Sequence, residues 1–281
     1  MRWPRFRFRW TRADGWGEIN GATDGALADA STRDASVAFD PATSQGLLAW
    51  FSADRDVTVT SASNPTVTSW KDQASGVNAT PVRRCLGPVR VLPPVGKPMV
   101  NFGRAQCLGM STSKAPSPIA GLTVLVSTRM DAALPTFDGR LLTMYQGTFF
   151  SVTRSVSRFN VAAFAPDQFA SAFSARTPLG DLTFASSKTQ ILSLRLATAG
   201  GGSTAEARLD GSPLALVAAP SRLPPLDYAF KALELGAGNN VDSPELDSFF
   251  GSLGEVLVFG RLLTPAEVSA AEAYLRVRWN T

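Results

Sequence analysis

Histidine is absent from the 281 residues of this chain, and its absence removes whole classes of chemistry. Without histidine, neither a Ser-His-Asp triad nor a Cys-His nucleophile pair can be assembled. Zinc sites with imidazole ligands and pH switches based on histidine titration are excluded as well. Carboxylates are therefore the side chains left for catalysis.

Cysteine is scarce, with Cys85 and Cys107 as its two occurrences. Two cysteines are too few for a disulfide scaffold, and they form no CxxC motif. Because free cysteine is among the most buried residue types, we predict two buried thiols, with a bond between them as the alternative.

Long hydrophobic runs are also missing, so no segment is expected to cross a bilayer. The chain begins with basic residues, but no apolar stretch or cleavage site follows them, and we expect no export signal. Neither an internal repeat nor a low-complexity tract is present.

Short apolar runs separated by Gly, Pro, Asn, Asp and Ser predict an all-β sandwich. Asp210-Gly211, between two alternating segments, is a strong hairpin signal. The pairs Pro93-Pro94 and Pro224-Pro225 belong at sheet edges or in loops, because proline cannot donate to a central ladder. Residues 46–281 are numerous enough to bury a core.

The last thirty residues predict one buried strand and one capped helix. Leu253 to Phe259 is an apolar run bounded by glycine, in which the buried acid Glu255 would need a hydrogen-bond donor or an arginine. Thr264, Pro265 and Glu267 form the pattern of a capping box with proline in the first turn. The expected buried face of the helix follows at helical spacing: Val268, Ala271, Leu275 and Trp279.

Several blocks occur in an order that resembles a known family. They are GLLAWFSAD (46–54), SWKDQASGVNAT (69–80), GKPMVNF (96–102), GLTVLVSTRM (121–130), ARLDGSPLA (207–215), LELG (233–236) and the closing strand and helix. In this arrangement the chain resembles the laminin-G-like jelly-roll domains of the concanavalin A-like lectin/glucanase superfamily. The resemblance implies a jelly-roll β-sandwich over residues 46–281 with one C-terminal helix. In the second block we expect Asp72 and Asn78 to shape a turn and Trp70 to pack in the core.

Charge is segregated before the sandwich. Residues 1–12 carry a charge of +5, residues 13–40 carry −5, and the whole chain carries +4. In residues 1–12 arginine alternates with aromatic residues, which would place the two kinds on opposite faces of a strand. Residues 13–45 lack apolar periodicity and predict an extended linker, so residues 1–45 are expected to form an arm.

The basic segment has four possible uses: docking to a protein, contact with nucleic acid, contact with a membrane surface, or no role as a solvated tail. The strict alternation favours docking as an added strand, with nucleic acid the less favoured partner. The predicted partner-docking residues are Arg2, Trp3, Arg5, Phe6, Arg7, Phe8, Arg9, Trp10 and Arg12.

The carboxylates do not form a recognisable catalytic pair. Glycosidases of the resembled superfamily use a Glu-x-Asp-x-x-Glu pattern, whereas here Glu245 and Asp247 are followed by Phe250 in place of the second Glu. We therefore expect no enzyme activity and no bound cofactor or metal. The same loop offers weak calcium ligands in Asp242, Glu245 and Asp247, with Asn239 and Asn240, although these residues also suit a plain turn.

The resemblance, the missing export signal and the arm together predict a non-enzymatic structural virion protein of a bacteriophage or phage-like particle. It would be made in the host cytoplasm and act as a capsid decoration, head fibre or tail accessory protein, present in several copies or as a homo-oligomer. Residues 1–45 would anchor it to other virion proteins. The sandwich would bind host-surface polysaccharide, and the candidate aromatic platform is Trp16, Tyr145, Phe149, Phe150 and Tyr228. A free carbohydrate-binding module is the main alternative and a glycoside hydrolase the third.

Overall fold

In the computed structural model, two antiparallel sheets pack as a β-sandwich. The structure describes residues 39–82, 85–93, 96–111, 121–130, 139–145, 149–155, 158–164, 171–176, 188–199, 202–218, 232–236 and 248–281. The sandwich with a helix near its C-terminal end confirms the predicted all-β class. Several predictions concern residues outside the described ranges. They are the docking residues of positions 1–12, the aromatic residues Trp16 and Tyr228, the prolines Pro94, Pro224 and Pro225, and the calcium-loop residues Asn239 to Asp247.

The first sheet has eight strands, in the order β15 (Ser212–Leu214), β14 (Gly202–Leu209), β13 (Gln190–Ala199), β8 (Gly121–Met130), β18 (Gly251–Phe259), β6 (Met99–Phe102) and β5 (Val89–Val91). The eighth strand, β1 (Leu47–Ser52), pairs with the second half of β18, while β6 pairs with its first half. Strand β18 therefore contacts three strands and lies at the centre of the sheet.

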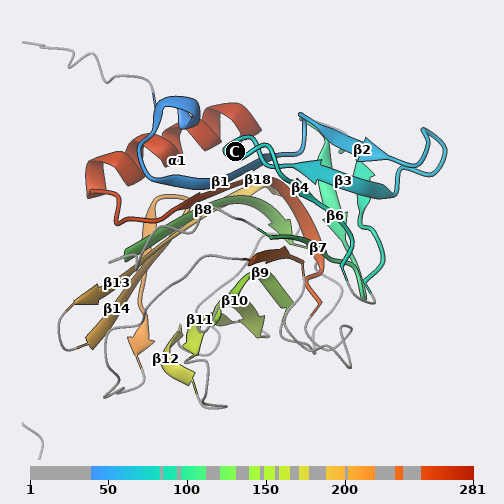
Figure 1. Cartoon of the computed structure of the whole chain (residues 1–281). Coiled ribbons are helices and arrows are strands. Elements are labelled where there is room, and N and C mark those ends of the chain that lie inside the picture. Colours follow the sequence, from blue (N-terminus) through green and yellow to red (C-terminus); the bar gives the residue numbers. More distant parts are fainter. Residues whose placement is uncertain are drawn as a thin grey trace, which may run out of the picture. The chain divides into compact units, whose positions relative to one another are not determined.

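The second sheet has seven strands, in the order β16 (Val217–Ala218), β12 (Ser171–Arg176), β11 (Arg158–Phe164), β10 (Phe149–Ser155), β9 (Gly139–Tyr145), β17 (Ala232–Leu235) and β7 (Leu108–Ser111). A small third sheet contains β2 (Val57–Val59), β3 (Val67–Lys71) and β4 (Asn78–Ala79). Helix α1 (Pro265–Trp279) lies across the outer face of the first sheet, and the second sheet lies on the other side (Figure 1). A short 3₁₀ turn, η1 (Pro41–Thr43), precedes β1.

The core lies on both faces of β18, all nine residues of which are buried. On the helix side, Phe259 contacts Phe39, whose ring also lies 5.6 Å from that of Tyr274. A bulge between Leu253 and Glu255 shifts the register with β8. Residues from Phe39 onward thus already pack against the closing strand.

Helix α1 begins and ends as its sequence predicts. The Thr264 hydroxyl accepts from the Glu267 amide, and the Glu267 carboxylate accepts from the Thr264 amide, which completes the capping box. Two hydrogen bonds from Arg261 lower the pKa of Glu267 to about 2. The expected inner face is confirmed, since Val268, Ala271, Leu275 and Trp279 are all buried.

Two predicted turns are present. Asp210 and Gly211 both have positive φ, at 51° and 85°, which matches the primed turn of a two-residue hairpin between β14 and β15. In the other turn, the buried Asp72 carboxylate accepts from the amides of Trp50, Ala74 and Ser75. Its role in shaping the turn is confirmed, and Trp70 is fully buried as expected.

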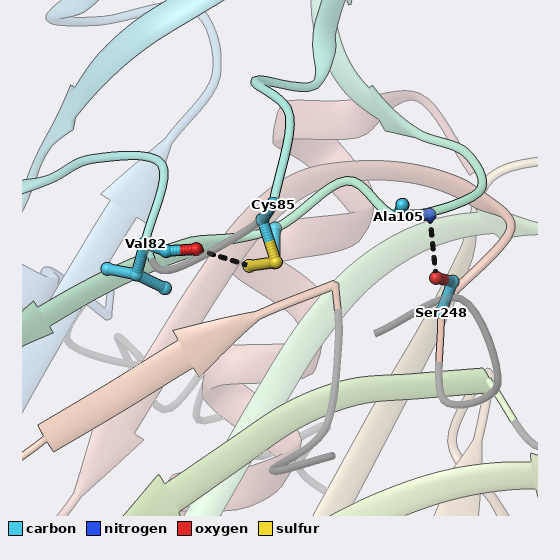
Figure 2. Close-up of a disulfide and its surroundings, with 5 residues drawn as sticks. Val82, Cys85, Ala105 and Ser248 are labelled. Atoms are coloured by element: carbon cyan, nitrogen blue, oxygen red, sulfur yellow. Dashed lines mark hydrogen bonds between the residues drawn. A yellow bond between two sulfur atoms is a disulfide. The ribbon is translucent and has the colours of Figure 1, made fainter. Parts of the chain in front are cut away.

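The prediction of two free thiols is wrong, because Cys85 and Cys107 form a disulfide (Figure 2). Backbone pairing brings them together: the Leu86 amide donates to the Ala105 carbonyl, and the Cys107 amide donates to the Leu86 carbonyl. These bonds set the two Cα atoms 5.4 Å apart, within the usual range for a disulfide. No cysteine spacing in the sequence signals this local pairing.

Candidate binding site at the end of helix α1

The most polar part of the core is a buried carboxylate, that of Glu255, which has no exposed surface. Oε1 accepts from Trp50 Nε1 at 2.7 Å and from the Tyr274 hydroxyl at 2.9 Å. Oε2 accepts from Trp279 Nε1 at 2.8 Å and lies 2.7 Å from Nε of Arg278 in an ion pair. The expected need of Glu255 for a donor or an arginine is thus confirmed.

A chain of charges leads from this carboxylate to the surface. Arg278 also binds Asp54 at 2.8 Å, and Asp54 in turn binds Lys97 at 2.9 Å. Partial burial acts to raise the pKa of Asp54, but the hydrogen bonds from Lys97 and Ser52 and the charge of Arg278 lower it overall. Because each charge has an opposite partner, the buried network is compensated.

Burial and the Glu255 charge both act on the neighbours of the carboxylate. Burial is the first cause that raises the pKa of Tyr274 well above its usual value, and the charge of Glu255 adds to it. Burial acts to lower the pKa of Arg278, but Glu255, Tyr274 and Asp54 raise it overall. Tyr274 is therefore a neutral donor and Arg278 a permanent cation over the physiological pH range.

Trp279 joins this network to a surface hollow. Its indole nitrogen is held by Glu255, its ring is 5% exposed, and Lys97 Nζ lies 5.9 Å from the ring centroid. Gly254 packs so close to the ring that a side chain has no room there, since a Cβ on Gly254 would lie 2.8 Å from Trp279 Cε3. The ring is thus held by Glu255 at its nitrogen and by close packing against Gly254.

The hollow has a volume of about 200 Å³. It lies where α1 ends, beside the end of β8 and the segment that enters β13. The residues that line it are Gly96, Arg129, Lys188, Thr189, Trp279, Asn280 and Thr281. Its side chains thus comprise two cations, two hydroxyls, one carboxamide and one indole, with no side-chain carboxylate.

The two cations of the hollow have no counter-charge within the described ranges. Arg129 is half-buried near the end of β8, and Lys188 is exposed two residues before β13. Neither side chain has an ion pair with any residue that the structure describes, in contrast to Arg278 nearby. The side chains that line the hollow therefore carry two positive charges and no negative charge.

Acidic side chains elsewhere in the described part of the chain serve the fold. Glu272, fully buried on α1, accepts from the Ser193 hydroxyl at 2.6 Å and pairs with Arg208 at 3.3 Å. Asp210 accepts from the Ile191 amide beside the hairpin. Within the ranges that the structure covers, no three acidic or cysteine side chains gather as a metal site would need.

The sequence prediction did not locate this hollow. Tyr145, Phe149 and Phe150 of the expected aromatic platform lie in β9 and β10 of the second sheet, but their side chains fall outside the described set. Arg129 and Lys188 are 59 positions apart, and neither belongs to a motif. The one available signal was Arg129, the single charged residue in a strand of otherwise uncharged residues.

Comparisons with known proteins bear on the fold. No family model and no curated protein matches the chain. Among solved structures, the chain is similar to a sialidase of Trypanosoma rangeli in complex with a difluorinated KDN, with a TM-score of 0.52 and 16% identity. The match covers 84% of this chain and 33% of the sialidase chain.

A second likeness is to the binding domain of botulinum neurotoxin DC in complex with SialylT, with a TM-score of 0.55 and 7% identity. It covers 82% of this chain and 52% of the toxin chain. A third similar structure is that of botulinum neurotoxin type C, whose cell entry depends on interaction with two ganglioside molecules. Its TM-score is 0.54 at 9% sequence identity, and the match covers 82% of this chain and 51% of the toxin chain.

The present chain thus spans between a third and about half of these proteins. At such identities the likeness shows the fold alone, and it supports the β-sandwich that the sequence predicts.

Proposed function

We propose that this chain is a non-enzymatic, lectin-like binding module whose sandwich recognises a glycan. The observation that carries the proposal is the likeness of its fold to a toxin binding domain solved with SialylT and to a ganglioside-dependent toxin. Fold does not determine function, so the proposal also needs a site. The positively charged hollow beside Trp279 is the candidate that the described residues offer.

The non-enzymatic part of the proposal is supported by the state of the carboxylates. Retaining glycoside hydrolysis needs two carboxyls facing one cleft, about 5–5.5 Å apart. Among the described residues, Asp54, Asp72, Glu255 and Glu272 are each held by hydrogen bonds or ion pairs that shape the fold. A carboxylate fixed in this way is a poor general acid or nucleophile.

A glycan array tests the binding. The full chain, carrying an N-terminal epitope tag for detection, is applied to neutral and acidic bacterial surface polysaccharides, with the heat-unfolded chain as the control. We expect selective retention of one or a few glycans. Retention of none, by a chain that is folded by circular dichroism, would refute glycan recognition. Release of reducing ends from any retained glycan would refute the non-enzymatic part.

The setting that we propose is a bacteriophage or phage-like virion, in which the arm anchors the module to other virion proteins. It is supported by the +5 charge and the alternating aromatic residues of positions 1–12. The test compares particles assembled with the full chain and with residues 1–12 deleted. We expect the deletion to abolish incorporation while the glycan-array profile stays unchanged, and equal incorporation of the two would refute anchoring.

A further inference from the structure

We propose that the hollow beside Trp279 binds an anionic saccharide, whose acidic group is held by Arg129 and Lys188; this inference rests on the proposed glycan recognition. The hollow combines a recess of about 200 Å³ with two cations that have no counter-charge among the described residues. Pockets for drug-sized ligands are larger, at about 300–1,000 Å³. The volume therefore suits one terminal sugar residue of a glycan and not an extended segment.

Arg129 is suited to grip a carboxylate or sulfate. It lies in β8 opposite Ser252 of β18, so its backbone is fixed by the centre of the sheet. Its side chain is half-buried, which limits the directions in which the guanidinium can point. A planar guanidinium donates two parallel hydrogen bonds to one carboxylate, and a partly desolvated site strengthens them.

Lys188 and Thr189 provide the second side of the hollow. Lys188 is exposed, so its ammonium adds positive charge with little geometric demand. The Thr189 hydroxyl both donates and accepts, as recognition of a sugar hydroxyl requires. Trp279 contributes a rigid wall, since Glu255 holds its indole nitrogen.

The end of helix α1 opposes an anion, but more weakly than the cations attract it. A helix C-terminus carries the equivalent of roughly half a negative charge. The two side-chain cations of the hollow exceed it, whereas Arg276 and Arg278 in the last turn are already paired with Glu272, Glu255 and Asp54. The local balance therefore favours an anionic over a neutral saccharide.

The experiment measures affinity of the full chain by isothermal titration calorimetry for matched pairs of saccharides. Trigalacturonic acid is compared with its methyl ester, which has the same backbone without the charge, and 3′-sialyllactose is compared with lactose. Inorganic phosphate is the third probe. The variants are Arg129→Gln and Lys188→Gln, with Arg104→Gln as the control because Arg104 is an exposed arginine that does not line the hollow.

We expect an acidic saccharide to bind, its neutral counterpart to bind at least tenfold more weakly, and binding to weaken as salt is raised. Loss of a hydrogen bond to a charged group should weaken binding by about tenfold or more in Arg129→Gln. Lys188→Gln should weaken it by a smaller factor, and Arg104→Gln should leave it unchanged. Unfolding curves that superimpose for all four proteins would show that the variants fold.

The alternative outcomes separate this inference from the function beneath it. Equal affinity for acidic and neutral saccharides, or affinity unchanged by both hollow substitutions, would overturn the charged site while glycan recognition stands. Inorganic phosphate bound as tightly as the acidic saccharide would show a general anion site and would overturn the assignment of a saccharide to the hollow. No saccharide binding in any arm, nor on the array, would overturn both.

Discussion

Replacement of Glu255 by glutamine should destabilise the sandwich more than any other single exchange of a carboxylate for its amide among the described residues. The substitution keeps the volume of the side chain but replaces one oxygen by an NH₂ group. Both oxygens of Glu255 are engaged: Oε1 by Trp50 and Tyr274, and Oε2 by Trp279 and Arg278. Whichever way the amide is turned, at least one fixed N–H group therefore faces another donor: that of Trp50 in one orientation, and those of Trp279 and Arg278 in the other.

The magnitude follows from burial. Leaving one buried partner of an ion pair without its counter-charge costs about 3–5 kcal/mol, and unsatisfied neutral donors cost about 1–3 kcal/mol each. Arg278 keeps its contact with Asp54, so the charge is not wholly orphaned and the lower end is the better expectation. We expect a loss of about 3–4 kcal/mol in the free energy of unfolding, equivalent to roughly 6–16 °C in Tm for a domain of this size.

The assay is urea unfolding followed by tryptophan fluorescence, because Trp50 and Trp279 both donate to the altered side chain. Glu206→Gln is the matched control: Glu206 is 67% exposed and pairs with Arg195, so its loss should cost at most about 1 kcal/mol. A Glu255→Gln protein within 1 kcal/mol of the wild type would show that neither the three donors nor the Arg278 ion pair depends on this carboxylate.

Three further changes test other parts of the fold. Gly254→Ala should cost about 1–3 kcal/mol by overpacking, because the new Cβ meets a rigid indole at 2.8 Å, whereas Gly103→Ala, with its nearest neighbour at 3.4 Å, should be near neutral in the same denaturation assay. Reduction of the Cys85–Cys107 bond should lower stability by about 3 kcal/mol for a loop of this length, and a Cys85→Ser/Cys107→Ser double variant should no longer respond to reductant. Because the pKa of Glu267 is lowered from 4.5 to about 2, its stabilising effect is complete above pH 4.5 and lost as pH falls towards 2. Glu267→Gln should therefore reduce the acid dependence of the free energy of unfolding by an amount on the order of 1 kcal/mol after solvent screening, and an unchanged pH profile would contradict this account.

Local signals in the sequence predicted the elements whose chemistry is local. The Thr264 capping box, the Asp210-Gly211 hairpin and the Asp72 turn each depend on side chains within a few residues, and all three are present. The strand predicted from Leu253 to Phe259 is confirmed within β18. The need of a buried Glu255 for donors was likewise predictable, because an acid inside an apolar strand must be compensated.

Contacts made across the fold were beyond sequence reasoning. The disulfide depends on a pairing between the loop at Leu86 and the turn at Ala105, neither of which carries a strand pattern. The hollow depends on where α1 stops relative to the end of β8, which is set by packing of Trp279 on Gly254. Such positions follow from the register of distant strands, for which one sequence gives no direct signal.

The central place of β18 has a consequence for how the protein is made. Strands β1, β6 and β8 are all synthesised before the segment that joins them, and β1 precedes its partner by about two hundred residues. During translation the edges of these earlier strands stay unpaired until β18 is made. Unpaired edges fold slowly into a sheet and associate readily with other nascent chains. A chain terminated or cleaved before Gly251 would lack β18, the strand that joins β1, β6 and β8. Quality control in the producing cell should therefore remove such truncated chains efficiently.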